Sequence, residues 1–166
     1  SATTIYNYGT ITGALWMGAY DDYLYNGDGG VWNPGQTPTD FGAGDDRIYN
    51  AGTINLDDSV IHMGTYSADG NFFYNSYYGT INVNGDSWID MGGPLALVPS
   101  ANQLPFYNYG TIDFTDGAAD DTLLITGDFA GQGYVNVDVS GLHGTSDQLY
   151  IDGSVVAGTV QTVNVD

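Results

Sequence analysis

A short phrase recurs along this chain, and its repetition constrains the fold more than any other feature of the sequence. In each copy an apolar residue, Tyr and Asn lead to Gly-Thr-Ile. Four copies occupy residues 5–11, 48–54, 73–81 and 106–112. Self-similarity of this kind is typical of solenoid proteins, in which no single repeat can bury a hydrophobic face alone. The sequence therefore predicts that successive copies stack on one another and share one core.

Each copy is predicted to form a strand, a turn and the start of a second strand. The apolar residue and Tyr favour a strand, Asn and Gly favour the turn, and Thr-Ile begins the next strand. A second phrase that ends in Gly follows every copy. The Gly residues of successive Gly-Thr-Ile phrases lie 43, 27 and 31 residues apart. This irregular spacing indicates a β-helix with loops of variable length.

The charged residues favour the same fold class and exclude several functions. All 20 acidic residues are Asp, Glu and Lys are absent, and Arg47 is the single basic residue. The charged helix formers are therefore nearly missing, and we expect an all-β chain. A formal net charge of −19 leaves no basic footprint for a nucleic acid and no attraction to an anionic membrane. Without Cys there is no disulfide or thiolate metal site.

The last third of the chain carries a different pattern. Residues 121–133 lead to Val135, Val137 and Val139, which alternate with polar residues and predict one buried face. A related pattern returns 26 residues later, an offset that suits a single coil. Over residues 121–165 this pattern resembles the end of autotransporter passengers, next to the region called the autochaperone.

The upstream Asn-x-Gly-Thr-Ile phrases are similar to coils of autotransporters and of filamentous haemagglutinins. The resemblance covers most of the chain. It implies a right-handed parallel β-helix that is displayed on a Gram-negative cell surface or secreted. The membrane barrel and the protease or lipase domain of such proteins have no counterpart in the sequence. We therefore expect a cleaved or excised passenger segment with no direct insertion into the membrane.

We expect one solenoid domain in two parts. Residues 1–120 are predicted to form irregular coils with two loops that leave the helix body. These loops are expected near residues 28–40 and 92–105, because both stretches are rich in Gly or Pro. Residues 121–166 are predicted to form autochaperone-like terminal coils of the same solenoid.

The sequence offers little for catalysis. A nucleophile triad needs a His base, and the chain has two His residues. His62 falls in a strand phrase where other copies carry Trp16 and Asp90, so it is predicted to lie on a sheet face. His143 lies in a predicted turn. A glycosidase needs one carboxyl with a raised pKa in an apolar cleft, whereas the Asp pairs here flank turns. We expect neither enzymatic activity nor a required cofactor.

Pairs of Asp suggest an alternative role in binding calcium. Two pairs lie 24 residues apart, near one coil, and are expected to stack. Stacked carboxylates repel one another, and either bound calcium or diffuse screening would relieve the repulsion. The candidate calcium ligands are Asp21, Asp22, Asp45, Asp46, Asp120 and Asp121. Arg47 directly follows one pair and is expected to compensate its charge.

Tyr recurs at one position of the repeat, and the chain contains 14 Tyr residues. The position is occupied by Tyr6, Tyr49, Tyr74 and Tyr107. A stacked aromatic ladder that stabilises the coils is the favoured interpretation, and a sugar-binding face is the alternative.

These observations predict an extracellular structural or adhesive module that forms a rigid β-solenoid shaft. A subunit of an extracellular filament or surface layer is one alternative, and a polysaccharide-active β-helix enzyme is another. The expected partners are further repeats of the same protein, or other copies end to end, together with a host surface or a glycan.

Overall fold

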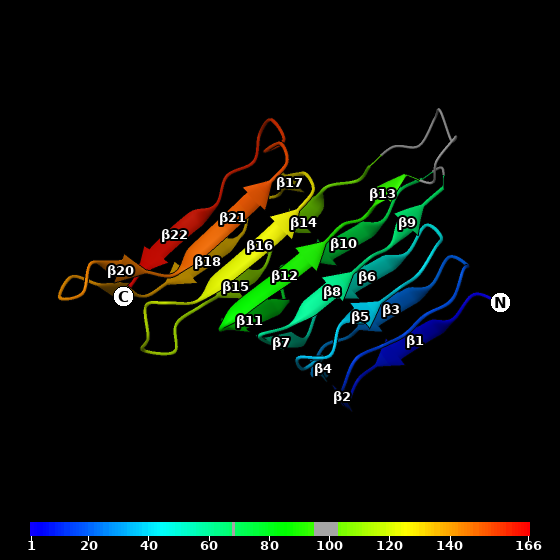
Figure 1. Cartoon of the computed structure of the whole chain (residues 1–166), viewed down its shortest axis with the longest axis horizontal. Coiled ribbons are helices and arrows are strands. Elements are labelled where there is room, and N and C mark those ends of the chain that lie inside the picture. Colours follow the sequence, from blue (N-terminus) through cyan, green and yellow to red (C-terminus); the bar gives the residue numbers. More distant parts are fainter. Residues whose placement is uncertain (68, 95–102) are drawn as a thin grey trace.

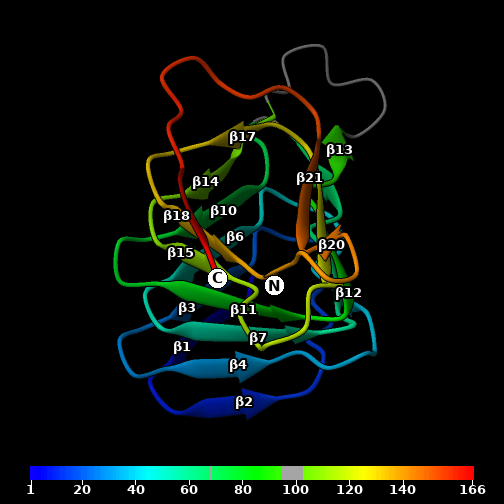
Figure 2. The ribbon, with the colours of Figure 1, turned by 90° about the vertical axis from the view of Figure 1, so that its left-hand side faces the viewer.

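The chain folds into a parallel β-helix, which confirms the fold class. The computed structural model describes residues 1–67, 69–94 and 103–166, and every regular element in them is a β-strand. Three sheets run along the molecule, and each coil contributes strands to the successive sheets (Figure 1). Seen from the C-terminal end, the chain winds counter-clockwise as it approaches the viewer, so the helix is right-handed (Figure 2).

Sheet A is built from the strands that carry the Tyr-Asn phrase. It contains β1 (Thr4–Asn7), β3 (Tyr23–Asn26), β6 (Arg47–Asn50), β10 (Phe72–Asn75), β14 (Phe106–Asn108) and β17 (Phe129–Ala130). Sheet B follows it in each coil and contains seven strands, one per coil. These are β2 (Thr10–Thr12), β4 (Val31–Asn33), β7 (Thr53–Asp57), β11 (Thr80–Asn84), β15 (Thr111–Asp113), β18 (Tyr134–Val137) and β22 (Thr162–Val165).

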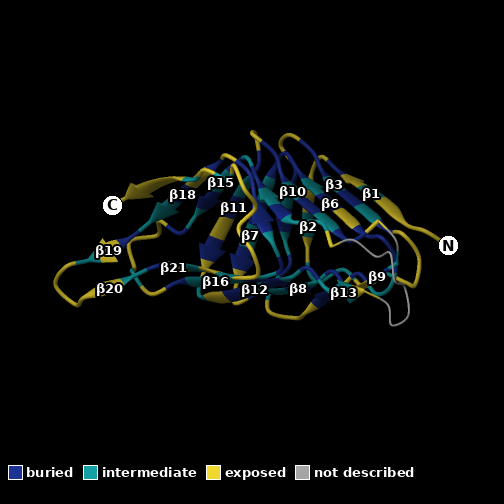
Figure 3. Cartoon of the chain, turned by 90° about the horizontal axis from the view of Figure 1, so that it is seen from above, coloured by how far each residue is buried: buried dark blue, intermediate teal, exposed yellow. Residues whose placement is uncertain are grey.

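Sheet C completes the cross-section of the solenoid. Its strands are β5 (Thr39–Asp40), β8 (Val60–His62), β12 (Asp86–Asp90), β16 (Thr122–Thr126) and β21 (Gln148–Asp152). A short parallel pair, β9 (Thr65–Tyr66) with β13 (Gly93–Pro94), extends two of the coils. An antiparallel hairpin of β19 (Val139–Ser140) and β20 (Thr145–Ser146) projects near the C-terminal end (Figure 3).

The repeated phrases occupy equivalent places in successive coils, as predicted. Tyr49 pairs with Tyr74 in sheet A, and Ile54 pairs with Ile81 in sheet B. In the three later copies the apolar residues of the phrase point inward and are fully buried, whereas Tyr points outward. In the first copy, Ile5 and Ile11 are partly buried. One column of the core consists of Leu24, Ile48, Phe73, Phe106 and Phe129. Burial of this continuous core supplies the main favourable free energy of folding.

The structure adds a coil that the sequence analysis missed. Residues 28–40 were expected to leave the helix body as a loop, but they contain β4 and β5, which pair in parallel with both neighbouring coils. The Trp32 side chain is fully buried in the core. The expectation failed because Val-Trp replaces Thr-Ile in this copy. The spacing of 43 residues therefore spans two coils.

The prediction of a second loop near residues 92–105 is wrong at the start of that stretch. Gly93–Pro94 forms strand β13 against β9, so the coil extends at least to Pro94. The apolar centre of this stretch lies outside the described residues. Further along, Val135 is buried and its neighbour Val137 is half-buried, but Val139 is 48% exposed because β18 ends before it. The expected offset of 26 residues is confirmed by the pairing of Leu123 with Leu149.

The Asn residues of the phrase form a buried ladder rather than only a turn. Each Asn lies at the end of a sheet A strand, at the corner where the chain enters sheet B. The Asn50 amide donates to the Asn75 side-chain oxygen at 2.8 Å and accepts from the Asn26 amide at 2.8 Å. The ladder runs through Asn7, Asn26, Asn50, Asn75 and Asn108 and ends on Gln161. A fully satisfied chain of hydrogen bonds of this kind fixes the stacking register.

Candidate functional site

The corner between sheets C and A holds a second ladder, made mainly of Asp. The backbone N–H of Asp22 donates to the Asp46 carboxylate at 2.7 Å, and the N–H of Asp46 donates to the Asn71 side-chain oxygen at 3.0 Å. The stacking expected for the two Asp pairs is therefore confirmed. The carboxylates bind backbone donors of the neighbouring coil, which explains why Asp recurs at this place in the repeat.

Asp46 has a strongly shifted pKa. Its side chain is fully buried, and the Oδ2 atom has no hydrogen-bond partner among the described residues. Burial is the main cause that raises the pKa of Asp46, to about 7; the hydrogen bond from the Asp22 N–H opposes the shift, and the nearby charges of Asp22, Asp21 and Asp45 contribute to it. A buried carboxyl without a cationic partner favours its neutral form.

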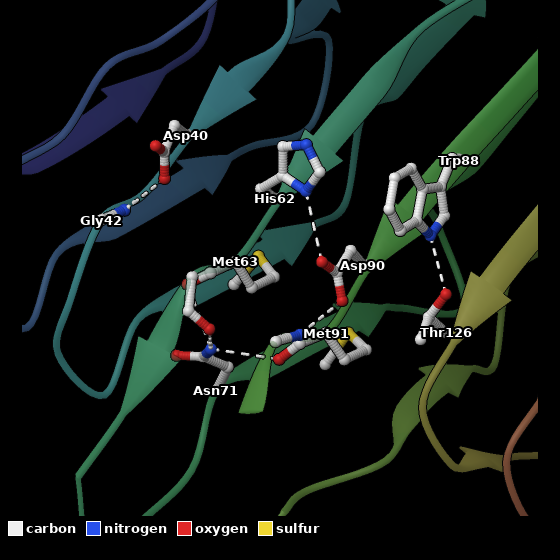
Figure 4. Close-up of polar contacts among 11 residues, drawn as sticks. Asp40, Gly42, His62, Met63, Asn71, Trp88, Asp90, Met91 and Thr126 are labelled. Carbon is white, nitrogen blue, oxygen red and sulfur yellow. Dashed lines mark hydrogen bonds and ion pairs between the residues drawn. The ribbon is translucent and has the colours of Figure 1, made fainter. Parts of the chain in front are cut away.

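The structure itself indicates what a neutral Asp46 would bind. Asn71 occupies the equivalent position in the next coil, and its amide donates to the backbone oxygens of Met63, Gly64 and Met91 at 3.0–3.1 Å (Figure 4). Because the Oδ1 atoms of Asp46 and Asn71 accept equivalent backbone N–H groups, we expect the Oδ2 atom of Asp46 to face the corresponding backbone oxygens one coil earlier. A protonated carboxyl can donate to such a carbonyl oxygen, whereas an ionised one would be repelled by it.

The other two acids of this corner differ in exposure. Asp21 is exposed, and its Oδ1 accepts the Asp45 N–H at 2.9 Å. Asp45 is buried and accepts the N–H groups of Ser67 and Gly70 with one oxygen. Its other oxygen accepts the Ser67 hydroxyl at 2.8 Å and the Asp69 N–H at 3.2 Å. The Asp45 carboxylate therefore holds the connection between β9 and β10 in place.

Asp120 and Asp121 lie at a different corner, between sheets B and C. Asp120 is exposed, whereas Asp121 is buried and accepts the Gly85 N–H. The Asp121 N–H donates in turn to Asp147 at 3.1 Å. Burial raises the pKa of Asp121 as well, and the charges of Asp116 and Asp147 add to this shift. The six candidate calcium ligands are thus divided between two corners.

No group of three or more His, Cys, Asp or Glu side chains that could hold a metal ion occurs in residues 1–67, 69–94 and 103–166. A specific calcium site therefore stays a prediction. In the described residues, the buried Asp side chains accept hydrogen bonds from neighbouring coils.

The two His residues lie as predicted, His62 on a sheet face and His143 in a turn. His62 is on the outer face of sheet C, in one column with Trp16, Asp40 and Asp90. Its Nδ1 atom lies 3.2 Å from the Asp90 carboxylate (Figure 4). His143 is in the turn between β19 and β20, and its Nδ1 lies 3.0 Å from the Ser140 hydroxyl.

The expected aromatic ladder is present on the outer face of sheet A. Tyr25 stacks on Tyr49 with ring centroids 5.3 Å apart, and Tyr49 stacks on Tyr74 at 5.2 Å. Tyr25 belongs to the coil that the sequence analysis missed. Because the rings face one another along the axis, they stabilise the stacking of coils.

A groove of about 690 Å³ lies over sheet A beside this ladder. Tyr23, Tyr49 and Phe72 line its aromatic part, and Arg47 stands between Tyr23 and Phe72 in the strand register. Asp21 also lines the groove, as do Asp22 and Asp45 of the acidic corner. The expected compensation of the preceding Asp pair by Arg47 stays a prediction, and Arg47 lines this groove together with Asp45.

Sequence reasoning did not find this groove, because its residues come from different coils. Arg47 was considered only with its neighbours in sequence, and Phe72 lies just before the repeated phrase and was not considered. The signal that could have found it is the column of Tyr23, Arg47 and Phe72, which requires the missed coil to be aligned.

In comparisons with known proteins, no protein-family profile, no curated protein and no solved structure matches this chain. Within the described residues there is also no helix of the length and hydrophobicity needed to cross a membrane.

Proposed function

We propose that this chain is a non-enzymatic structural module, a segment of the rigid shaft of an extracellular surface protein. The single observation that carries this proposal is the unbroken stacking of seven coils with a buried Asn ladder and a continuous apolar core. Such an arrangement resists bending and unfolding because each interior coil is hydrogen bonded to both neighbours.

The resemblance of the repeat phrases to autotransporter passengers supports an extracellular location on a Gram-negative surface. The composition agrees with a surface role, since a net charge of −19 keeps an extended solenoid soluble. An adhesive role for its outer faces is part of this proposal.

We further propose that each end of the module stacks on more coils, from the same protein or from another copy. At the C-terminal end, Val163 and Val165 continue inward-facing columns but are 58% and 61% exposed, and β22 leaves one backbone edge unpaired (Figure 3). An exposed strand edge and an uncovered core together favour a further coil.

The shaft proposal is tested by replacing part of a known passenger shaft in a Gram-negative host with this chain. A reporter domain precedes the insert, and a translocating barrel follows it. We expect the reporter to reach the cell surface and the insert to resist proteinase K. The matched control carries Asn50→Ala and Asn75→Ala, which remove two members of the buried ladder and three of its hydrogen bonds. These changes should lower both surface display and protease resistance. Rapid digestion of the unmodified insert, or release of new reducing ends from an added polysaccharide, would refute the proposal.

A further inference from the structure

The groove over sheet A is lined by two exposed charged residues, Arg47 and Asp21, and by two buried acids that the fold uses. Asp22 accepts the N–H groups of Thr3 and Gly18, so its carboxylate is used within the fold. Asp45 is likewise engaged by the connection between β9 and β10. The exposed Arg47 guanidinium and the exposed Asp21 carboxylate have no such full set of partners.

These groups have complementary chemistry. A guanidinium offers only hydrogen-bond donors, and a carboxylate offers only acceptors. A ligand that satisfies both at once must carry acceptors and donors close together, which is a property of neighbouring hydroxyl groups. The aromatic part of the groove, formed by Tyr23 and Phe72, suits the apolar C–H surface of the same ligand.

Charge restricts the ligand further. The field of a protein with a net charge of −19 repels an anionic chain. Asp21, Asp22 and Asp45 line the groove together with Arg47, so a cationic group is disfavoured only where it would lie directly beside the Arg47 guanidinium. A neutral ligand avoids both penalties. The volume of about 690 Å³ is within the range of small-molecule sites.

We propose that this groove binds a neutral, hydroxyl-rich glycan whose chain runs along the solenoid axis. Arg47 donates to sugar hydroxyls, Asp21 accepts from them, and Phe72 contacts the face of a sugar ring. Tyr23, Arg47 and Phe72 belong to three successive coils, so the site extends over two steps of about 4.8 Å each. That length accommodates two or three sugar residues. A shaft needs no ligand, so the assignment goes beyond the shaft itself; it names a ligand class for the adhesive role that the proposed function includes.

Binding to a printed array of neutral, cationic and anionic oligosaccharides tests the proposal with the whole chain. The neutral oligosaccharide with the strongest signal is then titrated by calorimetry. We expect Arg47→Gln and Phe72→Ala each to raise its Kd at least about tenfold, because each removes a main contact. Tyr134→Ala is the matched control, since Tyr134 is an aromatic residue of sheet B that is 51% exposed and lies outside the groove. It should leave the Kd unchanged.

Circular dichroism and melting curves of each variant separate a lost contact from a lost fold. Three outcomes would overturn the proposal: no neutral oligosaccharide binds, a charged one binds more tightly than any neutral one, or Arg47→Gln binds as the unmodified chain does. None of these outcomes bears on whether the solenoid serves as a shaft, so the two proposals fail separately.

Discussion

At the scale of single residues, Asp performs different tasks that the sequence does not distinguish. Asp21 is exposed, Asp45 holds a loop by its backbone N–H groups, and Asp46 is buried with one oxygen unpartnered. The sequence analysis found the pairs and their stacking. It could not assign these tasks, because they depend on which neighbouring coil presents a backbone N–H group or a carbonyl oxygen.

The raised pKa of Asp46 predicts a protein that loses stability as the pH rises. In the unfolded chain this carboxyl ionises near its ordinary value of 3.8, whereas in the folded chain it ionises near 7. Between these values the unfolded state releases the proton and the folded state keeps it. The contribution of Asp46 to stability is therefore complete below about pH 4 and is lost as the pH rises through about 7.

Asp46→Asn should remove most of this pH dependence, since Asn71 already occupies the equivalent position in the next coil. We expect the variant to be at least about 1 kcal/mol more stable than the unmodified chain at pH 8, a rise in Tm of about 2–4 °C or more. Urea unfolding at several pH values from 4 to 8 measures this. Asp28→Asn, in an exposed turn, is the control. Equal pH profiles for Asp46→Asn and the unmodified chain would contradict the account.

At the scale of elements, strands were predicted well where the phrase was complete and missed where it varied. The strands around Ile48, Phe73 and Phe106 follow from the alternation of apolar and polar residues. The coil that contains Trp32 was missed, although Tyr23–Asn26 carries the same Tyr-Asn ending. Sequence reasoning also assigned Asn to the turn alone, because a buried role for an amide becomes visible only when coils are stacked.

The Asn ladder predicts different costs for two similar substitutions. Asn50 is fully buried, so Asn50→Ala leaves the Asn26 amide and the Asn75 oxygen short of a partner. We expect the free energy of unfolding to fall by at least about 2 kcal/mol and the Tm to fall by about 5 °C or more. Asn82 belongs to an exposed ladder on sheet B, where its amide donates to Asn55 at 2.7 Å. Water can replace that hydrogen bond, so Asn82→Ala should lower the free energy of unfolding by less than about 1 kcal/mol. Similar melting curves for the two variants would argue against a buried ladder.

At the scale of the whole molecule, repetition made the fold predictable and left the groove unpredictable. Stacking follows from the phrases themselves, because equivalent residues must occupy equivalent places in successive coils. The groove residues do not occupy one repeated position of the phrase. They extend from Asp21 to Leu104 and come from several coils and the corners between them. Its residues are brought together by the register between coils, and one missed coil was sufficient to hide it.

The central claim is that the coils stack in parallel with the Asn side chains in one buried column. Through-space contacts between assigned side-chain amides in a ¹⁵N-edited nuclear Overhauser spectrum test it most directly. The account predicts cross-peaks that connect successive Asn amides separated by 19, 24, 25 and 33 residues in sequence, as in Asn7, Asn26, Asn50, Asn75 and Asn108. A spectrum in which these amides show contacts only to their neighbours in sequence, or contacts typical of antiparallel hairpins, would contradict it.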